Sequence, residues 1–156
     1  MDLIKLLNVS ILDYDQDVKQ IKDKKKEALY EITLKNNEQA FILPIVVDNT
    51  TSENLTKLIL LKAIHNQNFL KFNSLLFRND ELFIGYEVMN HSITEYIYLQ
   101  KLKIEERIVL YKQLIEIILI LLIFGEKFES FDFNMFFIDN KLENNSIIKL
   151  LYFGIF

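Results

Sequence analysis

The sequence predicts an α+β fold with a sheet-rich first half and a helical second half. The length of 156 residues fits one domain, on a prior of about 150 residues per domain. Hydrophobic residues make up 51% of the chain, including 13 Phe and 7 Tyr, which excludes intrinsic disorder. Stretches that alternate apolar and polar residues come in pairs, and stretches with helical spacing separate and follow these pairs.

The first strand pair is predicted around a turn at Asn36-Asn37. Residues 29–34 alternate apolar and polar side chains and predict one strand. Residues 39–47 predict the second strand. Pro44 indicates that this second strand lies at an edge or carries a bulge, because proline has no backbone N–H to donate.

A second hairpin is predicted from residues 72–77 and 81–88, with its turn at 78–80. The charged residues 19–27 predict a solvated turn. Residues 1–15 remain ambiguous, and we assign them only as an N-terminal extension of unknown role.

Three helices are predicted. Residues 48–52 offer several N-cap side chains before a helix that ends near His65. A short helix is expected at 92–99 and a long one from 104 to about 124. The most apolar part of the long helix, residues 114–124, is shorter than the roughly 20 residues of a membrane-spanning helix, so we interpret it as a buried core helix.

The end of the chain predicts two short strands, at 135–138 and 147–151, around a polar turn at 140–146. No signal peptide is expected, because the N-terminus lacks a positive region and a small-residue cleavage site. Without a signal or a spanning helix, the expected location is cytoplasmic.

Composition excludes several function classes. The 18 Lys and Arg against 22 Asp and Glu give a net charge of -4, which argues against nucleic-acid binding. The absence of cysteine excludes disulfides, thiolate metal sites and a Cys nucleophile. His65 and His91 are too few for a His-rich metal site, and we interpret them as loop and turn residues.

Several stretches resemble the protein-kinase domain. Residues 60–72, LLKAIHNQNFLKF, resemble the end of helix αC and the strand after it, and residues 81–97, ELFIGYEVMNHSITEYI, resemble the hinge region and helix αD. Residues 104–124 resemble helix αE. Residues 128–141, FESFDFNMFFIDNK, resemble the catalytic loop, and residues 147–156, IIKLLYFGIF, resemble the region of the Asp-Phe-Gly motif.

This resemblance covers roughly residues 16–156 and holds without a gap from Gln113 to Asp139. It implies a protein-kinase-like fold with a small antiparallel-sheet N-lobe at 16–88. Residues 89–156 would form a partial helical C-lobe that ends near the Asp-Phe-Gly position. Because the covering helices of a complete lobe lie beyond that position, we expect the helix at 104–124 to expose apolar surface.

The same resemblance places unsuitable residues at the nucleotide-binding positions of the N-lobe. Lys22, Lys24 and Glu27 fall on the three glycines of the phosphate loop, where side chains block the close approach of the backbone. Leu43 falls on the phosphate-binding lysine. Lys57, or Thr56 in a register shifted by one, falls on the glutamate that pairs with that lysine.

The positions of the catalytic loop are also replaced. Phe128, Glu129 and Ser130 stand for His-Arg-Asp, and Ser130 is a poor general base without an activating partner. Met135 replaces the metal-ligating Asn with a soft thioether. Tyr152 replaces the metal-binding Asp, so the resemblance implies neither catalysis nor a metal site.

We therefore expect a catalytically inactive kinase homologue that acts as a protein-binding or regulatory module. Its partner, or a second copy, would bind the apolar helix 104–124, without nucleic acid or membrane. An alternative is a diverged ATP-binding serine/threonine kinase represented by a truncated gene. In that case the hinge backbone of Glu87 and Met89 would hold the adenine weakly, without Mg²⁺-dependent turnover. A third alternative is a decayed copy without function.

For three further features we expect an ordinary structural role and not a functional one. Asp132 and Asp139 are expected to be plain loop acids. The cluster from Lys22 to Lys26 is expected to be solvated, and the sharper hypothesis is that its charge attracts phosphate.

Overall fold

A computed structural model describes residues 8–24, 29–126, 133–142 and 145–152 of the chain. The chain divides into two compact units. The first comprises Met1–Ile64 and Lys71–Val88, and the second comprises His65–Leu70 and Met89–Phe156. Both units combine strands and helices, which confirms the α+β class.

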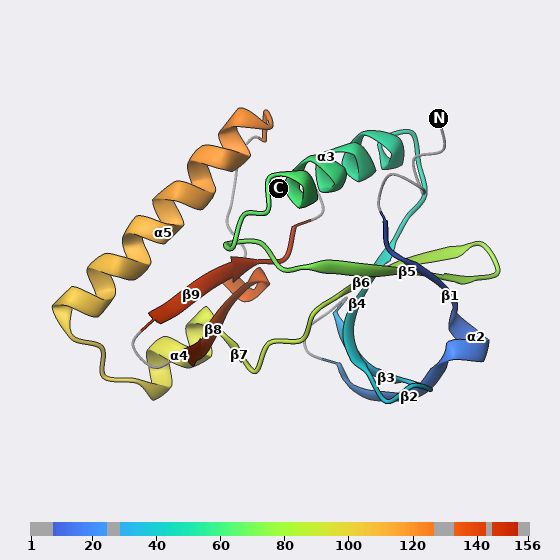
Figure 1. The fold of residues 1–156 in the computed structure, drawn as a ribbon, viewed down its shortest axis with the longest axis horizontal. Helices are drawn as coiled ribbons and strands as arrows, with labels where there is room; N and C mark the ends of the chain where they lie inside the picture. Colours follow the sequence, from blue (N-terminus) through green and yellow to red (C-terminus); the bar gives the residue numbers. More distant parts are fainter. Residues whose placement is uncertain (1–7, 25–28, 127–132, 143–144, 153–156) are drawn as a thin grey trace. The chain divides into compact units, whose positions relative to one another are not determined.

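The first unit contains a six-stranded sheet in the order β1-β5-β6-β4-β3-β2. All neighbouring strands are antiparallel except β1 and β5, which run parallel. Figure 1 shows that the sheet curls strongly toward β2. Its strands are β1 (Ser10–Asp13), β2 (Val18–Lys24), β3 (Tyr30–Leu34), β4 (Gln39–Ile45), β5 (Phe72–Arg78) and β6 (Glu81–Tyr86).

Both predicted hairpins are present. Asn37 between β3 and β4 has a φ of 68°, and Asn79 between β5 and β6 has a φ of 50°. Asparagine tolerates this left-handed conformation better than most residues, which explains why these turns were visible in the sequence.

The prediction of a solvated turn at 19–27 is wrong for its described part. Strand β2 spans Val18–Lys24 and pairs with β3 at the edge of the sheet. Edge strands gain their backbone hydrogen bonds from one neighbour and commonly carry lysines that discourage further pairing. A charged stretch is therefore compatible with this position, and charge alone did not identify a turn.

The expectation that Pro44 marks an edge strand or a bulge is wrong, because β4 pairs with both neighbours without a register shift. Strand β4 lies inside the sheet, between β3 and β6. Its pairing with β3 ends at Ile42, however, whereas Pro44 is still opposite Phe83 of β6. The missing N–H therefore falls beyond the last described pair of β4 with β3, which joins Ile42 to Tyr30.

The core of the first unit lies against the curled sheet and includes Ile32, Leu34, Ala40, Ile42, Leu76 and Phe83. The N-terminal extension 1–15 has no expected role, but its described part forms β1 and the start of the short helix α2 (Tyr14–Asp17), which belong to this unit. The Tyr14 ring stacks on Phe83, with 4.9 Å between ring centroids. Helix α3 (Thr51–Ala63) buries Leu58 and Leu61.

The second unit contains a three-stranded antiparallel sheet in the order β7-β8-β9, formed by β7 (His91–Ser92), β8 (Phe136–Leu142) and β9 (Asn145–Leu150). A short 3₁₀ helix, η1 (Phe133–Met135), precedes β8. Helix α4 (Ile93–Leu99) begins with a capping box between Ser92 and Glu95.

Helix α5 (Ile104–Ile123) runs alongside β9 (Figure 1). Leu110, Ile117 and Leu121 are its buried residues. The prediction that 114–124 forms a buried core helix is wrong, because only one face of α5 packs against the rest of the unit. In the described part of the chain, no helix is long and apolar enough to cross a membrane.

Candidate functional site

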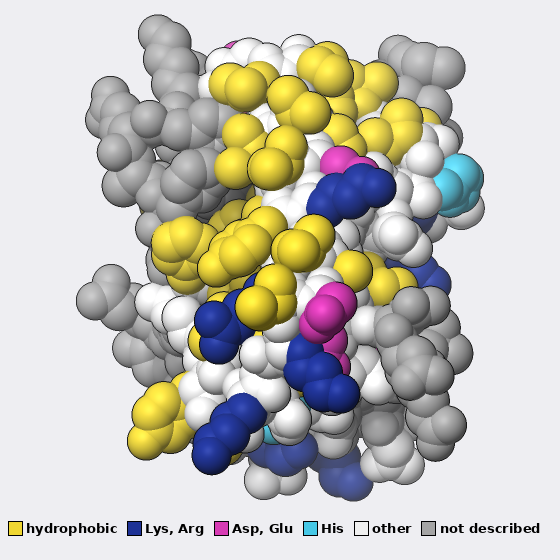
Figure 2. Space-filling model, turned by 90° about the vertical axis from the view of Figure 1, so that its left-hand side faces the viewer, with side chains coloured by type: hydrophobic (Ala, Val, Ile, Leu, Met, Phe, Trp, Pro, Cys, Tyr) yellow, Lys and Arg dark blue, Asp and Glu magenta, His cyan; other side chains and the backbone are white. Residues whose placement is uncertain are grey.

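The most unusual surface of the second unit is the side of α5 that faces away from β9, which we call the outer face of α5. Figure 2 views the molecule from the side on which Figure 1 draws α5, and hydrophobic side chains form a broad band there. Six large apolar side chains on this face are between 52% and 72% exposed: Ile104, Ile108, Tyr111, Ile115, Leu119 and Leu122. Contiguous apolar surface of this kind marks interaction sites in soluble proteins.

Charged side chains on α5 lie beside this face and do not interrupt it. Glu105, Glu106 and Arg107 are exposed at the start of the helix, and Lys112 and Glu116 near its middle. Long charged side chains can extend sideways into water, so the apolar side chains between them remain accessible to a partner.

A hollow of about 200 Å³ adjoins the outer face, between α4 and α5. Most of its lining side chains are apolar, and Gln100, Arg107 and Tyr111 contribute polar groups. The lining residues are Ile93, Ile97, Gln100, Leu102, Arg107, Leu110, Tyr111 and Leu114. Tyr111 belongs both to the hollow and to the outer face, so the two surfaces are continuous.

A hydrogen-bond network fixes the position of α5 on β9. The Gln113 side chain donates to the Ser146 carbonyl at 2.9 Å and accepts from the Ile148 N–H at 2.9 Å. Its carbonyl oxygen also accepts from the side-chain amide of Asn68 at 3.0 Å. The outer face is therefore carried by a helix with a defined rotation, as a specific binding surface requires.

Helix α4 is attached to the same strand region. The Tyr96 hydroxyl and the Ser146 hydroxyl lie 2.9 Å apart. Ser146 thus contacts both helices through different atoms, its hydroxyl with Tyr96 and its carbonyl with Gln113. Sequence reasoning did not single out Asn68 or Ser146, because one asparagine or serine in a polar loop carries no pattern.

The described residues at kinase-like positions in the first unit lie on different elements, Lys22 on β2, Leu43 on β4 and Lys57 on α3. Leu43 is buried in β4, opposite Ile84 of β6. The Lys57 ammonium lies 3.4 Å from the Glu53 carboxylate, one turn earlier on α3. Lys57 therefore has a carboxylate partner on its own helix.

Two kinase-like positions lie in the described part of the second unit. Met135 ends η1. Tyr152 is buried, its hydroxyl donates to the buried Glu126 carboxylate, and its ring meets Phe69 edge-on at 6.3 Å between centroids. Phe128, Glu129, Ser130 and Asp132 lie outside the described residues, as do Lys25, Lys26 and Glu27.

The two hinge candidates are both engaged in the fold. The Glu87 N–H donates to the Lys71 carbonyl at 3.0 Å, and the Glu87 carboxylate accepts from the Lys71 N–H at 2.9 Å. Met89 is buried. The backbone N–H of Glu87 is thus occupied by Lys71.

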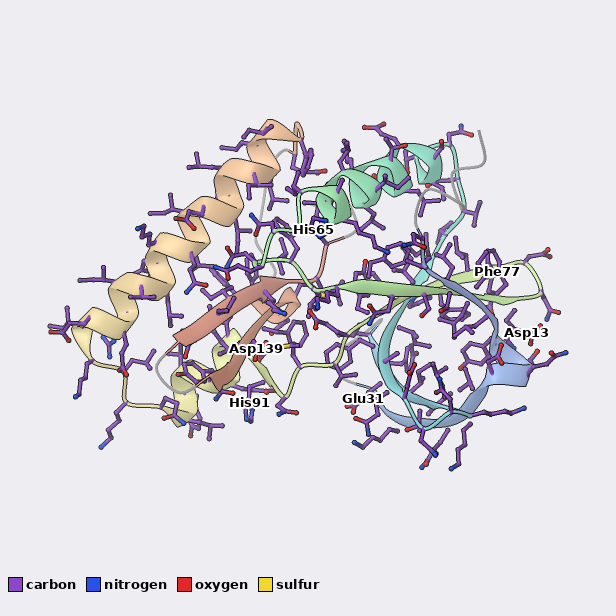
Figure 3. The ribbon with its side chains drawn as sticks, in the orientation of Figure 1. Asp13, Glu31, His65, Phe77, His91 and Asp139 are labelled. Carbon is purple, nitrogen blue, oxygen red and sulfur yellow. The ribbon has the colours of Figure 1, made fainter. Side chains whose placement is uncertain are left out.

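Figure 3 labels three of the remaining candidates, His65, His91 and Asp139. His65 lies in a turn, as expected, whereas His91 lies in β7 and Asp139 in β8, so the expectations of a turn residue and of a loop acid are wrong for these two. Exposed His65 has a φ of 49°, in a turn, and the His91 ring lies 3.8 Å from the Glu95 carboxylate. Asp139 pairs with Lys149 at 3.7 Å. Lys22 pairs with the buried Glu31 at 3.3 Å. Among the described residues, no three His, Asp or Glu side chains gather into a group that could hold a metal ion.

No model of a known protein family matches this chain, and no curated protein matches it either.

Proposed function

We infer that this chain is a non-catalytic protein-binding module of protein-kinase-like architecture, and that the outer face of α5 is its binding surface. The observation that carries this proposal is the continuous apolar surface on α5, which a fixed helix presents to solvent. Burying large apolar side chains provides about 1.5–3 kcal/mol each when burial is complete, so a matching partner gains substantial free energy here.

The order of elements supports the kinase-like part of the proposal. Strands β3 and β4 precede α3, strands β5 and β6 follow it, and α4, α5 and the β8–β9 hairpin come last. The resemblance implies the same succession of strand pair, helix, strand pair, helices and late hairpin. Element order alone does not define a family, so the assignment remains our proposal.

The residues at the replaced kinase positions lack the chemical groups that phosphoryl transfer needs. Phosphoryl transfer in kinases depends on positioning and on charges around ATP and Mg²⁺. Leu43 offers no cation, and neither Met135 nor Tyr152 offers a carboxylate to a hard metal ion. Removing one preorganised electrostatic contact costs about 3–4 kcal/mol of transition-state stabilisation, and here several contacts are replaced together.

The test is a phosphate-transfer assay combined with thermal melts of the 156-residue protein, with and without ATP and Mg²⁺. We expect no transfer to an acceptor protein and a melting midpoint that ATP does not change, because a ligand stabilises only the state that it binds. Robust transfer would overturn the proposal. A midpoint raised by ATP without transfer would favour the alternative of a nucleotide-binding protein.

A further inference from the structure

We propose that a second copy of this chain covers the outer face of α5, through antiparallel pairing of the two α5 helices about a two-fold axis that crosses the outer face at the level of residue 113. This inference rests on the proposed function, because it names the partner that the binding surface takes.

Apolar residues on α5 follow a regular spacing. One row of six residues alternates steps of four and three positions: Ile104, Ile108, Tyr111, Ile115, Ile118 and Leu122. We call this row the seam. Alternating steps of three and four keep a row on one side of a helix and are the spacing through which two helices pack. Five of the six side chains are more than half exposed, and Ile118 is partly buried.

The seam has the same spacing when it is read in either direction along α5. Its steps read 4, 3, 4, 3, 4 in both directions, so an antiparallel copy aligns every layer. Ile104 of one copy meets Leu122 of the other, Ile108 meets Ile118, and Tyr111 meets Ile115. Each layer occurs twice, as a self-complementary two-fold interface requires.

The exposed apolar area on α5 is large enough to compare with known interfaces. The seam and the adjacent Leu119 together expose apolar surface on the order of 600–700 Å² per copy, close to the roughly 800 Å² that one partner contributes to a standard interface. Exposed Ile97 of the neighbouring helix α4 lines the same hollow as Tyr111 and extends this apolar surface. Two copies together offer on the order of 1,200–1,400 Å² of apolar surface, at the lower end of the standard range for specific interfaces.

The polar residues near the middle of α5 lie where they do not obstruct the pairing. Gln113 lies on the opposite side of α5 from the seam, where it bonds to β9, so the pairing leaves the network of the unit intact. Lys112 lies beside the seam, and the two-fold axis places it next to its own copy. The repulsion between the two ammonium groups is small while both extend into water. Because only this register brings the two copies of position 112 together, their proximity tests the register.

The test of the interface is the mass in solution, measured by sedimentation or light scattering over a range of concentrations. We expect wild type at twice the mass of the chain and an Ile108→Asp/Ile115→Asp variant at the mass of one chain. The circular dichroism spectrum of the variant should be unchanged, because both side chains are more than half exposed. Its melting midpoint should not depend on protein concentration, whereas that of the wild-type dimer should. The matched control is Val46→Asp on the first unit, where Val46 is 83% exposed, and it should remain a dimer.

The register is tested with single cysteines, since the chain has none. Lys112→Cys places two thiols side by side, and a short thiol-to-thiol crosslinker should join them. Glu105→Cys is equally exposed on α5, but its two copies would lie about 24 Å apart along the helices, at 1.5 Å per residue, and should not be joined. Equal crosslinking at both positions, or at neither, would overturn the antiparallel seam.

The two proposals fail in different ways. A wild-type protein that is monomeric at all concentrations overturns the dimer. A dimer that Ile108→Asp/Ile115→Asp leaves intact overturns the α5 interface. Neither result bears on phosphate transfer. Phosphate transfer from ATP overturns the proposed function, whatever the mass in solution.

Discussion

The side-chain amide of Asn68 donates a hydrogen bond to the side-chain carbonyl of Gln113, 3.0 Å away, and joins the loop before β5 to the middle of α5. Asn68 also donates to the Ile148 carbonyl at 2.9 Å, so one buried asparagine bridges a helix and a strand that are far apart in the sequence. This bridge determines which face of α5 turns inward and which remains available to a partner.

Replacing Gln113 with Leu should destabilise the second unit. The substitution removes one of the two acceptors of the Asn68 amide and the side-chain acceptor of the Ile148 N–H. A buried polar group that loses its partner costs about 1–3 kcal/mol. Urea unfolding followed by circular dichroism measures the loss. Glu116→Ala, at an exposed position on the same helix, is the control and should stay within about 0.5 kcal/mol of wild type.

Gly85→Ala should destabilise the sheet of the first unit. Gly85 on β6 is opposite Ser74 on β5, and a Cβ at Gly85 would clash with the Ser74 hydroxyl oxygen. Overpacking of a filled interior costs about 1–3 kcal/mol. A Ser74→Ala/Gly85→Ala double variant removes the clashing oxygen and leaves the Ser74 Cβ at 3.4 Å, so it should recover part of the melting temperature. No recovery in the double variant would contradict this explanation.

Tyr152→Phe should lower the stability of the second unit by about 1–3 kcal/mol, because it deprives the buried Glu126 carboxylate of a hydrogen-bond donor. Tyr98→Phe provides the matched control, since Tyr98 is 89% exposed and its hydroxyl is replaced by the same change. Equal melting temperatures for the two variants would show that the Tyr152–Glu126 contact does not contribute to stability.

The start of α3 should weaken in acid. The Thr50 hydroxyl and the Thr50 N–H, each 2.7 Å from the Asp48 carboxylate, hold the pKa of Asp48 below its usual value of 3.8. Since the pKa is lower in the folded state, this stabilisation is present above pH 3.8 and is lost as the pH falls through the folded pKa. Thermal melts between about pH 2 and pH 6 should show a smaller acid-dependent loss for Asp48→Asn than for wild type.

Local sequence patterns determined the elements of this protein. The β3–β4 and β5–β6 hairpins, the capped helix α4 and the long helix α5 all lie close to their predicted ranges. These features depend on interactions within a few residues, such as the left-handed turns at Asn37 and Asn79 and the capping box at Ser92. Short-range backbone and side-chain preferences are readable from a single sequence.

Only the tertiary structure decided burial and pairing. The charged strand β2 forms because β3 offers it an edge, and β1 joins β5 in parallel across a long stretch of sequence. Helix α5 is apolar on most sides, so its composition did not distinguish the face that packs on β9 from the outer face. The contacts of Gln113 with Asn68, Ser146 and Ile148 make that choice. Burial depends on residues far apart in the chain, and a single sequence contains no local signal for them.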